Sequence, residues 1–340
     1  MAAPLGVRHS EIGRSAIPGE NDGCDVAVNG VMRGLLLTVL MSIATPAAAQ
    51  DVDATVQAQL WESCLLGGAP SSVELACTAA LALPDLSEHD TAAVLAQHGN
   101  AHAVMGQWDR AVPDLARALE LNHEEPTALL ARSIGLLDRG DPVRVIVDLT
   151  AFLRWLPGHA GALNARAIAN VRAGRPVAAV ADFTEALRLS PNHPLLLHNR
   201  GNALRDLGRT EAAIRDYNLA VQSGGASARL LSDRCLARLS RGDLLLAEVD
   251  CDAAATMAPD EPGLIENAGI VALKQNRQEK ALAAFGGALA IRPNLPWSLY
   301  GRGVLRIRRG DVPSGLADIR EAQSLAPRVS DDFERFGIRP

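Results

Sequence analysis

A glycine or an asparagine recurs every 34 residues along most of this chain. The seven positions are Gly106, Gly140, Gly174, Gly208, Gly242, Asn276 and Gly310. Glycine and asparagine are the residue types that best tolerate a positive φ at the end of a helix. The constant spacing therefore predicts a tight turn that recurs with no insertion or deletion between its copies.

Apolar residues keep the same register after each turn. Ala213, Tyr217 and Ala220 stand five, nine and twelve positions after Gly208, and such offsets share one face of an α-helix. Proline ends the unit, where a helix must stop, at Pro157, Pro191, Pro259, Pro293 and Pro327. Each unit is therefore predicted to be a helix, a turn, a second helix and a short break. The seven registers are 92–125, 126–159, 160–193, 194–227, 228–261, 262–295 and 296–329.

The composition agrees with an all-α fold. Apolar residues make up 48% of the chain but aromatic residues only 3%, which suits helices packed closely through small side chains. One helix pair cannot bury its apolar face alone, so neighbouring pairs are expected to stack into an α-solenoid of antiparallel helices. The net charge of −6 comes with no basic stripe, which argues against nucleic-acid binding.

Residues 199–208, Asn-Arg-Gly-Asn-Ala-Leu-Arg-Asp-Leu-Gly, followed by Ala213, Tyr217 and Ala220, resemble the tetratricopeptide repeat. The resemblance covers residues 92–329 and implies a right-handed superhelix whose concave face is lined by the first helix of each pair. Members of that family bind proteins and peptides on this face and are rarely catalytic. The flanking residues 53–91 are predicted to be a degenerate helix pair, and residues 330–340 a short C-terminal cap.

The N-terminus resembles an export signal. Residues 34–44 are an apolar run followed by Thr-Pro-Ala-Ala-Ala-Gln, which is typical of a signal peptide over residues 32–49 that is cleaved near Ala49. The run is shorter than the roughly 20 residues that span a bilayer, so no membrane span is expected after cleavage. Residues 1–31 contain acidic side chains and are interpreted as a misassigned extension upstream of Met32. We expect a periplasmic or secreted bacterial protein.

Arginine recurs eight residues before the turn and aspartate eight residues after it. The pairs are Arg132 with Asp148, Arg166 with Asp182, Arg200 with Asp216, Arg234 with Asp250, and Arg302 with Asp318. The sixth repeat lacks both members, with Ala268 and Ala284, and the first repeat has His98 with Asp114. Because the two columns are present or absent together, they predict structural ion pairs within one repeat. An anion-binding arginine ladder is the alternative.

Two cysteine pairs are predicted to form disulfides, since disulfides persist in exported proteins. They are Cys64 with Cys77, and Cys235 with Cys251. The alternative is four reduced cysteines that pack as small apolar residues.

No catalytic constellation is evident: a nucleophile elbow, a phosphate-binding Walker loop and a paired-cysteine zinc motif are all missing from the sequence. His98 and His102 are four residues apart, as two metal ligands on a helix would be, but no third ligand is evident. The sequence therefore predicts neither an enzyme nor a metal or cofactor site.

The family register assigns the concave groove to residues that are mostly apolar, with Trp297 and Tyr300 as expected anchors for a partner. These groove residues are Leu130, Ile134, Leu137, Ile168, Val171, Asn202, Leu236, Leu239, Ile270, Leu273, Trp297 and Tyr300. Polar members include Asn164, His198, Arg205, Glu266 and Arg308. Two functions remain open: a scaffold that holds an unknown protein or peptide in the groove, or an accessory subunit of an envelope enzyme or assembly complex that is bound through its convex face or ends.

Overall fold

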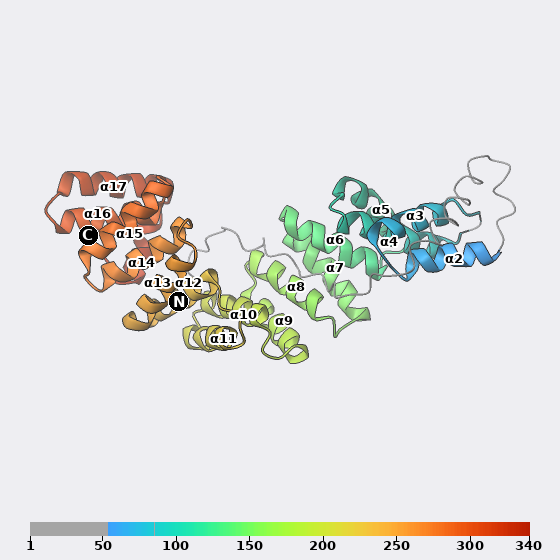
Figure 1. Cartoon of the computed structure of the whole chain (residues 1–340), viewed down its shortest axis with the longest axis horizontal. Helices are drawn as coiled ribbons and strands as arrows, with labels where there is room; N and C mark the ends of the chain where they lie inside the picture. The colour runs from blue at the N-terminus through green and yellow to red at the C-terminus, as the bar shows by residue number, and fades with distance from the viewer. Residues whose placement is uncertain (1–53, 85) are drawn as a thin grey trace. The chain divides into compact units, whose positions relative to one another are not determined.

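The computed structural model describes residues 54–84 and 86–340, so the predicted extension, the signal peptide and Ala49 lie outside the described residues. The described residues form α-helices joined by short turns and include no strand (Figure 1). The fold is all-α, as the 34-residue period predicts.

Two compact units divide the chain at the turn of the third predicted repeat. The N-terminal unit, which we take as described residues up to Gly174, contains α2 (Ala54–Leu65), α3 (Pro70–Leu81), α4 (Glu88–Val104), α5 (Trp108–Leu121), α6 (Pro126–Arg139), α7 (Pro142–Trp155) and α8 (Ala160–Arg172).

The C-terminal unit, residues 175–340, contains α9 (Pro176–Leu189), α10 (Pro194–Asp206), α11 (Thr210–Gln222), α12 (Ala228–Arg241), α13 (Leu244–Met257), α14 (Pro262–Lys274), α15 (Gln278–Ile291), α16 (Pro296–Arg308), α17 (Val312–Leu325) and α18 (Val329–Arg335). Within each unit, helices that are consecutive in sequence pack against one another.

All seven repeating turn positions have a positive φ, between 59° at Asn276 and 92° at Gly242. An L-residue with a Cβ is strained there, and asparagine is among the few that tolerate it. At Gly140 and Gly242 the turn residue directly caps the preceding helix in the left-handed conformation. The sequence predicts these turns correctly because each turn depends on one residue that must adopt a positive φ.

Proline begins many of the helices, including α6, α10, α14 and α16. The first helical position suits proline, because its missing N–H would have no intrahelical acceptor there. Each 34-residue repeat thus ends with a short break, and the first helix of the next repeat begins within a few residues.

Large rings fill the core against glycines of the facing helix. A Cβ added at Gly201 would lie 2.5 Å from the Tyr217 ring, and one added at Gly301 would lie 2.3 Å from the Phe285 ring. Both rings are fully buried. A bulky residue on one helix therefore requires a minimal residue opposite, which explains how so few aromatic residues build this core.

Candidate protein-binding surface

The first helix of each repeat carries the residues assigned to the groove. In the N-terminal unit, five half-buried aliphatic residues lie on α6 and α8, and we call them the apolar inner surface: Leu130, Ile134, Leu137, Ile168 and Val171. The two helices lie side by side, since Arg172 of α8 donates a hydrogen bond to the carbonyl oxygen of Leu137. The structure thus brings these five predicted groove residues onto one pair of neighbouring helices.

In the C-terminal unit, four of the predicted groove residues are instead part of the core. Leu239, Ile270, Leu273 and Tyr300 are 4%, 0%, 2% and 3% exposed. They belong to one apolar cluster built mainly from α12 to α18, and Leu236 and Trp297 pack against it while remaining half-buried. The prediction that these four side chains line an open groove is wrong, because helix-to-helix packing within the unit and the C-terminal segment already cover them.

The C-terminal segment supplies that cover for Trp297 and Tyr300. The ring of Phe333 lies 5.6 Å from Trp297 and 4.7 Å from Tyr300, centroid to centroid, and Phe336 lies 6.1 Å from Trp297. Arg308 donates a 2.7 Å hydrogen bond to the carbonyl oxygen of Arg339. The expected partner anchors are therefore occupied by the chain's own cap.

A polar cluster occupies the inner helices α10 and α12. Asp233 receives a 2.8 Å hydrogen bond from Arg205 on one carboxylate oxygen and lies 2.8 Å from His198 Nε2 through the other. Tyr217 donates a 2.7 Å hydrogen bond to Asn202 beside them. The cluster is largely enclosed, with Asp233 and Arg205 side chains 19% and 21% exposed.

Electrostatics in this cluster favour the ionised carboxylate. Burial by itself would raise the pKa of Asp233, but the Arg205 guanidinium and the His198 hydrogen bond outweigh it and hold that pKa below its ordinary value. Burial raises the pKa of Tyr217 well above its ordinary value. Both groups therefore keep one protonation state near neutral pH, as Asp233 anion and neutral Tyr217.

The family register assigns His198, Asn202 and Arg205 to the groove but does not mark Asp233. The available signal was that corresponding positions of other repeats hold small or neutral residues, namely Ala131, Ala165, Asn199 and Asn267. A single charged residue in that column marks a local departure from the repeat pattern.

Four of the five predicted arginine–aspartate pairs are present within their repeats. The shortest distances are 2.7 Å for Arg132–Asp148, 2.7 Å for Arg200–Asp216, 2.6 Å for Arg234–Asp250 and 2.8 Å for Arg302–Asp318. Arg166 and Asp182 lie in different units, and their pairing stays a prediction. In the first repeat His98 lies 2.8 Å from Asp114.

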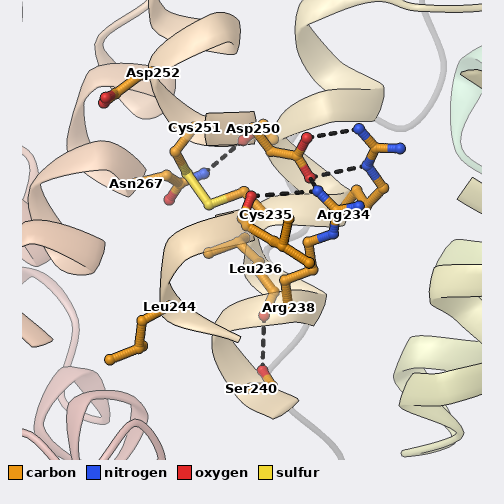
Figure 2. The surroundings of a disulfide bond; sticks show 12 residues. Arg234, Cys235, Leu236, Arg238, Ser240, Leu244, Asp250, Cys251, Asp252 and Asn267 are labelled. Atoms are coloured by element: carbon orange, nitrogen blue, oxygen red, sulfur yellow. Dashed lines mark hydrogen bonds and ion pairs between the residues drawn. A yellow bond between two sulfur atoms is a disulfide. The ribbon is translucent and has the colours of Figure 1, made fainter. Parts of the chain in front are cut away.

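Both predicted cysteine pairs are joined in the structure. The Cys64–Cys77 disulfide links α2 to α3, and the Cys235–Cys251 disulfide links α12 to α13. Figure 2 shows the second bond beside Asp250, which accepts hydrogen bonds from Arg234 and from Arg238. A covalent link and an ion pair therefore hold the same two helices.

Comparison with known families finds the tetratricopeptide repeat at residues 149–194 and again at residues 195–223. The chain therefore contains tetratricopeptide repeats at these residues. No curated protein matches the chain. Among solved structures, PilF of Pseudomonas aeruginosa is similar with 19% identity and a TM-score of 0.53, over 62% of this chain and 96% of that one. The Cut9–Hcn1 hetero-tetramer of the APC/C is similar with 14% identity and a TM-score of 0.57, over 89% of this chain and 59% of that one. These likenesses support the fold alone.

The tetratricopeptide repeat typically serves as a scaffold for protein–protein interaction. In its described part, no helix combines the length and the apolar character needed to cross a bilayer. One group of metal-ligating side chains gathers there, His98, His102 and Asp114. The sequence marks the two histidines as possible ligands and Asp114 as the partner of His98, and the structure brings all three together.

Proposed function

We propose that this chain is an exported, non-catalytic scaffold that binds an apolar peptide or helix of a partner protein on the apolar inner surface of its N-terminal unit. The observation that carries the proposal is the gathering of Leu130, Ile134, Leu137, Ile168 and Val171 on two neighbouring inner helices. Their half-buried state leaves apolar area to be removed from water by a partner, at about 25 cal/mol per Å².

The C-terminal unit supports the choice of this surface by contrast. Its inner face carries a polar cluster around Asp233 whose members hydrogen-bond one another. At the end of the chain the rings of Phe333 and Phe336 cover it. Neither region offers an unpaired apolar strip. A partner that recognises aliphatic side chains therefore fits the N-terminal unit better.

Export is supported by the disulfides and by the signal-like residues 32–49. Disulfides persist in oxidising compartments and are rare where glutathione keeps thiols reduced. Intact mass of protein purified from the periplasm, measured with and without reductant, tests this part: the mass should rise by two hydrogens for each bond on reduction. An unchanged mass, or retention of the chain in the cytoplasm, would contradict it.

A binding experiment tests the surface. A photo-crosslinking residue at Ile134 or Ile168 should capture the partner in cells, and the captured segment should be apolar. Ile134→Asp and Ile168→Asp should each weaken binding of that partner to the purified full chain at least about tenfold, since an apolar contact becomes a buried charge. Thermal unfolding of each variant shows whether the fold is intact. Unchanged binding by folded Ile134→Asp protein would refute the proposal.

A second candidate is an accessory subunit that is held through its outer surface. The observation in its favour is that α7 exposes large apolar side chains, with Val143, Val147 and Trp155 57%, 63% and 58% exposed. Such a patch commonly marks an interface. If Val147→Asp releases the partner and Ile134→Asp does not, the accessory-subunit function replaces the groove function.

A further inference from the structure

We propose that His98, His102 and Asp114 form a binding site for a divalent transition-metal ion between α4 and α5. The two histidines are one helical turn apart on α4, with ring centroids 4.5 Å apart, and Asp114 projects from α5. The ligand atoms of the three side chains lie within 4.8 Å of one another. All three residues belong to the N-terminal unit.

The hydrogen bonds around His98 are compatible with a metal ion at its Nδ1 side. Thr78 Oγ1 donates to the carbonyl oxygen of Glu74 at 2.8 Å, so the same oxygen accepts the proton of His98 Nε2 at 3.2 Å. A neutral ring then presents an Nδ1 lone pair to Asp114 Oδ2 at 2.8 Å. In that tautomer Nδ1 and Asp114 Oδ2 both offer an electron pair, and a metal ion bound to both removes their repulsion.

His102 is prepared for the same ion. Its Nδ1 lies 3.0 Å from Gln107 Oε1, an acceptor, so the ring proton is on Nδ1 and Nε2 keeps a free lone pair. The side chain is 3% exposed, and no described residue hydrogen-bonds its Nε2. Thr78 and Gln107 are thus placed to select these tautomers, which is the role that outer-shell partners play for metal-bound histidines.

The register explains why this repeat has a metal-like ligand set. His98 takes the position that Arg132 and Arg200 hold in later repeats. It stands opposite the aspartate that recurs eight residues after the turn. Those repeats place a guanidinium charge between the helices. Here the imidazole lacks a permanent charge, and a bound metal ion supplies it at the same place.

Two imidazoles and one carboxylate select a class of ion. This set suits Zn²⁺, Ni²⁺ or Cu²⁺ rather than Ca²⁺ or Mg²⁺, which prefer oxygen ligands. Zn–N and Zn–O distances of about 2.1 Å place tetrahedral ligands roughly 3.4 Å apart. Side-chain movements of about 1 Å bring the three atoms from their present separation to that value. Asp114 is 22% exposed, so water reaches the remaining coordination position.

The test uses the full mature chain without a histidine tag, titrated with Co²⁺ by absorption spectroscopy and with Zn²⁺ by calorimetry. We expect one ion per chain and cobalt bands typical of four-coordinate nitrogen and oxygen ligation. His102→Ala and His98→Arg should each lose at least about tenfold in affinity, while His123→Ala, which alters a histidine outside the site, should bind as the native chain does.

His98→Arg is the matched variant, because it restores the arginine–aspartate pair of the other repeats while removing a ligand. It should keep the metal-free unfolding temperature of the native chain or raise it, and Zn²⁺ should then add no further stabilisation. In the native chain Zn²⁺ should raise the unfolding temperature as mass action requires. The proposal is overturned if the native chain binds neither ion with a dissociation constant below about 1 mM, or if folded His98→Arg protein binds as tightly.

Discussion

Removing one member of an ion pair between two helices should lower the free energy of unfolding by more than the intact pair contributes to it. The Arg200–Asp216 pair is the clearest case, because Asp216 accepts both of its side-chain hydrogen bonds, at 2.7 and 2.8 Å, from this one guanidinium. The side chains are 23% and 10% exposed. Arg200→Ala leaves a nearly buried carboxylate without a donor, and that asymmetry is what the variant measures.

The magnitudes follow from these exposures. Arg200→Ala should lower the free energy of unfolding by about 3 kcal/mol, at the low end for a broken buried pair because some solvent remains. Asp216→Ala should cost about 2 kcal/mol, since the more exposed arginine keeps its hydrogen bond to Thr184. The double variant should cost about 3 kcal/mol rather than the sum of about 5, a coupling of about 2 kcal/mol.

Urea unfolding followed by circular dichroism measures all three variants against the native chain. The exposed pair Arg188–Glu185, with side chains 69% and 44% exposed, provides the control, and Arg188→Ala should show no measurable loss. The sixth repeat, with alanine at both positions, shows that the fold accepts a repeat lacking the pair. Strictly additive costs of the two single changes would refute the reasoning, because the residues would then act independently.

Three further outcomes follow from the same contacts. Cys235→Ala with Cys251→Ala should lower stability by about 3 kcal/mol, since the bond closes a loop of 16 residues, as urea unfolding would show. Gly301→Ala should destabilise by about 1–3 kcal/mol through overlap with a core ring, whereas Gly287→Ala, where an added Cβ meets nothing, should stabilise slightly. Asp233 has a folded pKa below its unfolded value, so its stabilisation is present above about pH 4 and lost as pH falls further; Asp233→Asn should therefore flatten stability against pH on the acid side.

The sequence predicts the turns, the helix pairs and the intra-repeat contacts because each depends on local or fixed spacing. A positive φ at Gly208 or Asn276 is a property of one residue. The arginine and aspartate of a pair are always 16 residues apart across one turn, so their register fixes their contact. Cys235 and Cys251 are also 16 residues apart across one turn, and their register fixes their contact in the same way.

The repeat register predicts which side chains are exposed in a groove only where no segment distant in the sequence covers them. Whether Ile270 or Tyr300 faces a partner depends on how far the next repeat closes over it and on where the C-terminal segment lies. Neither fact is encoded in the 34-residue period. Asp233 was missed as a member of a polar cluster for a related reason, because its partners His198 and Arg205 come from a second helix that the repeat pattern does not align with it. The register aligned Asp114 with His98, but it did not show that His102 lies beside them.

The salt dependence of partner affinity distinguishes an apolar binding surface from a charged one. In the C-terminal unit the inner charges satisfy one another: the two oxygens of Asp233 bind Arg205 and His198, which leaves little unpaired charge for a partner. The apolar inner surface of the N-terminal unit has aliphatic side chains at all five of its positions. Binding through it should therefore change less than about threefold when NaCl rises from about 0.05 to 0.5 M, because screening acts on charge pairs and not on apolar contact. Measured by calorimetry on the full chain, a fall in affinity of about a hundredfold over this range would place the partner on charged groups instead and contradict an aliphatic binding surface.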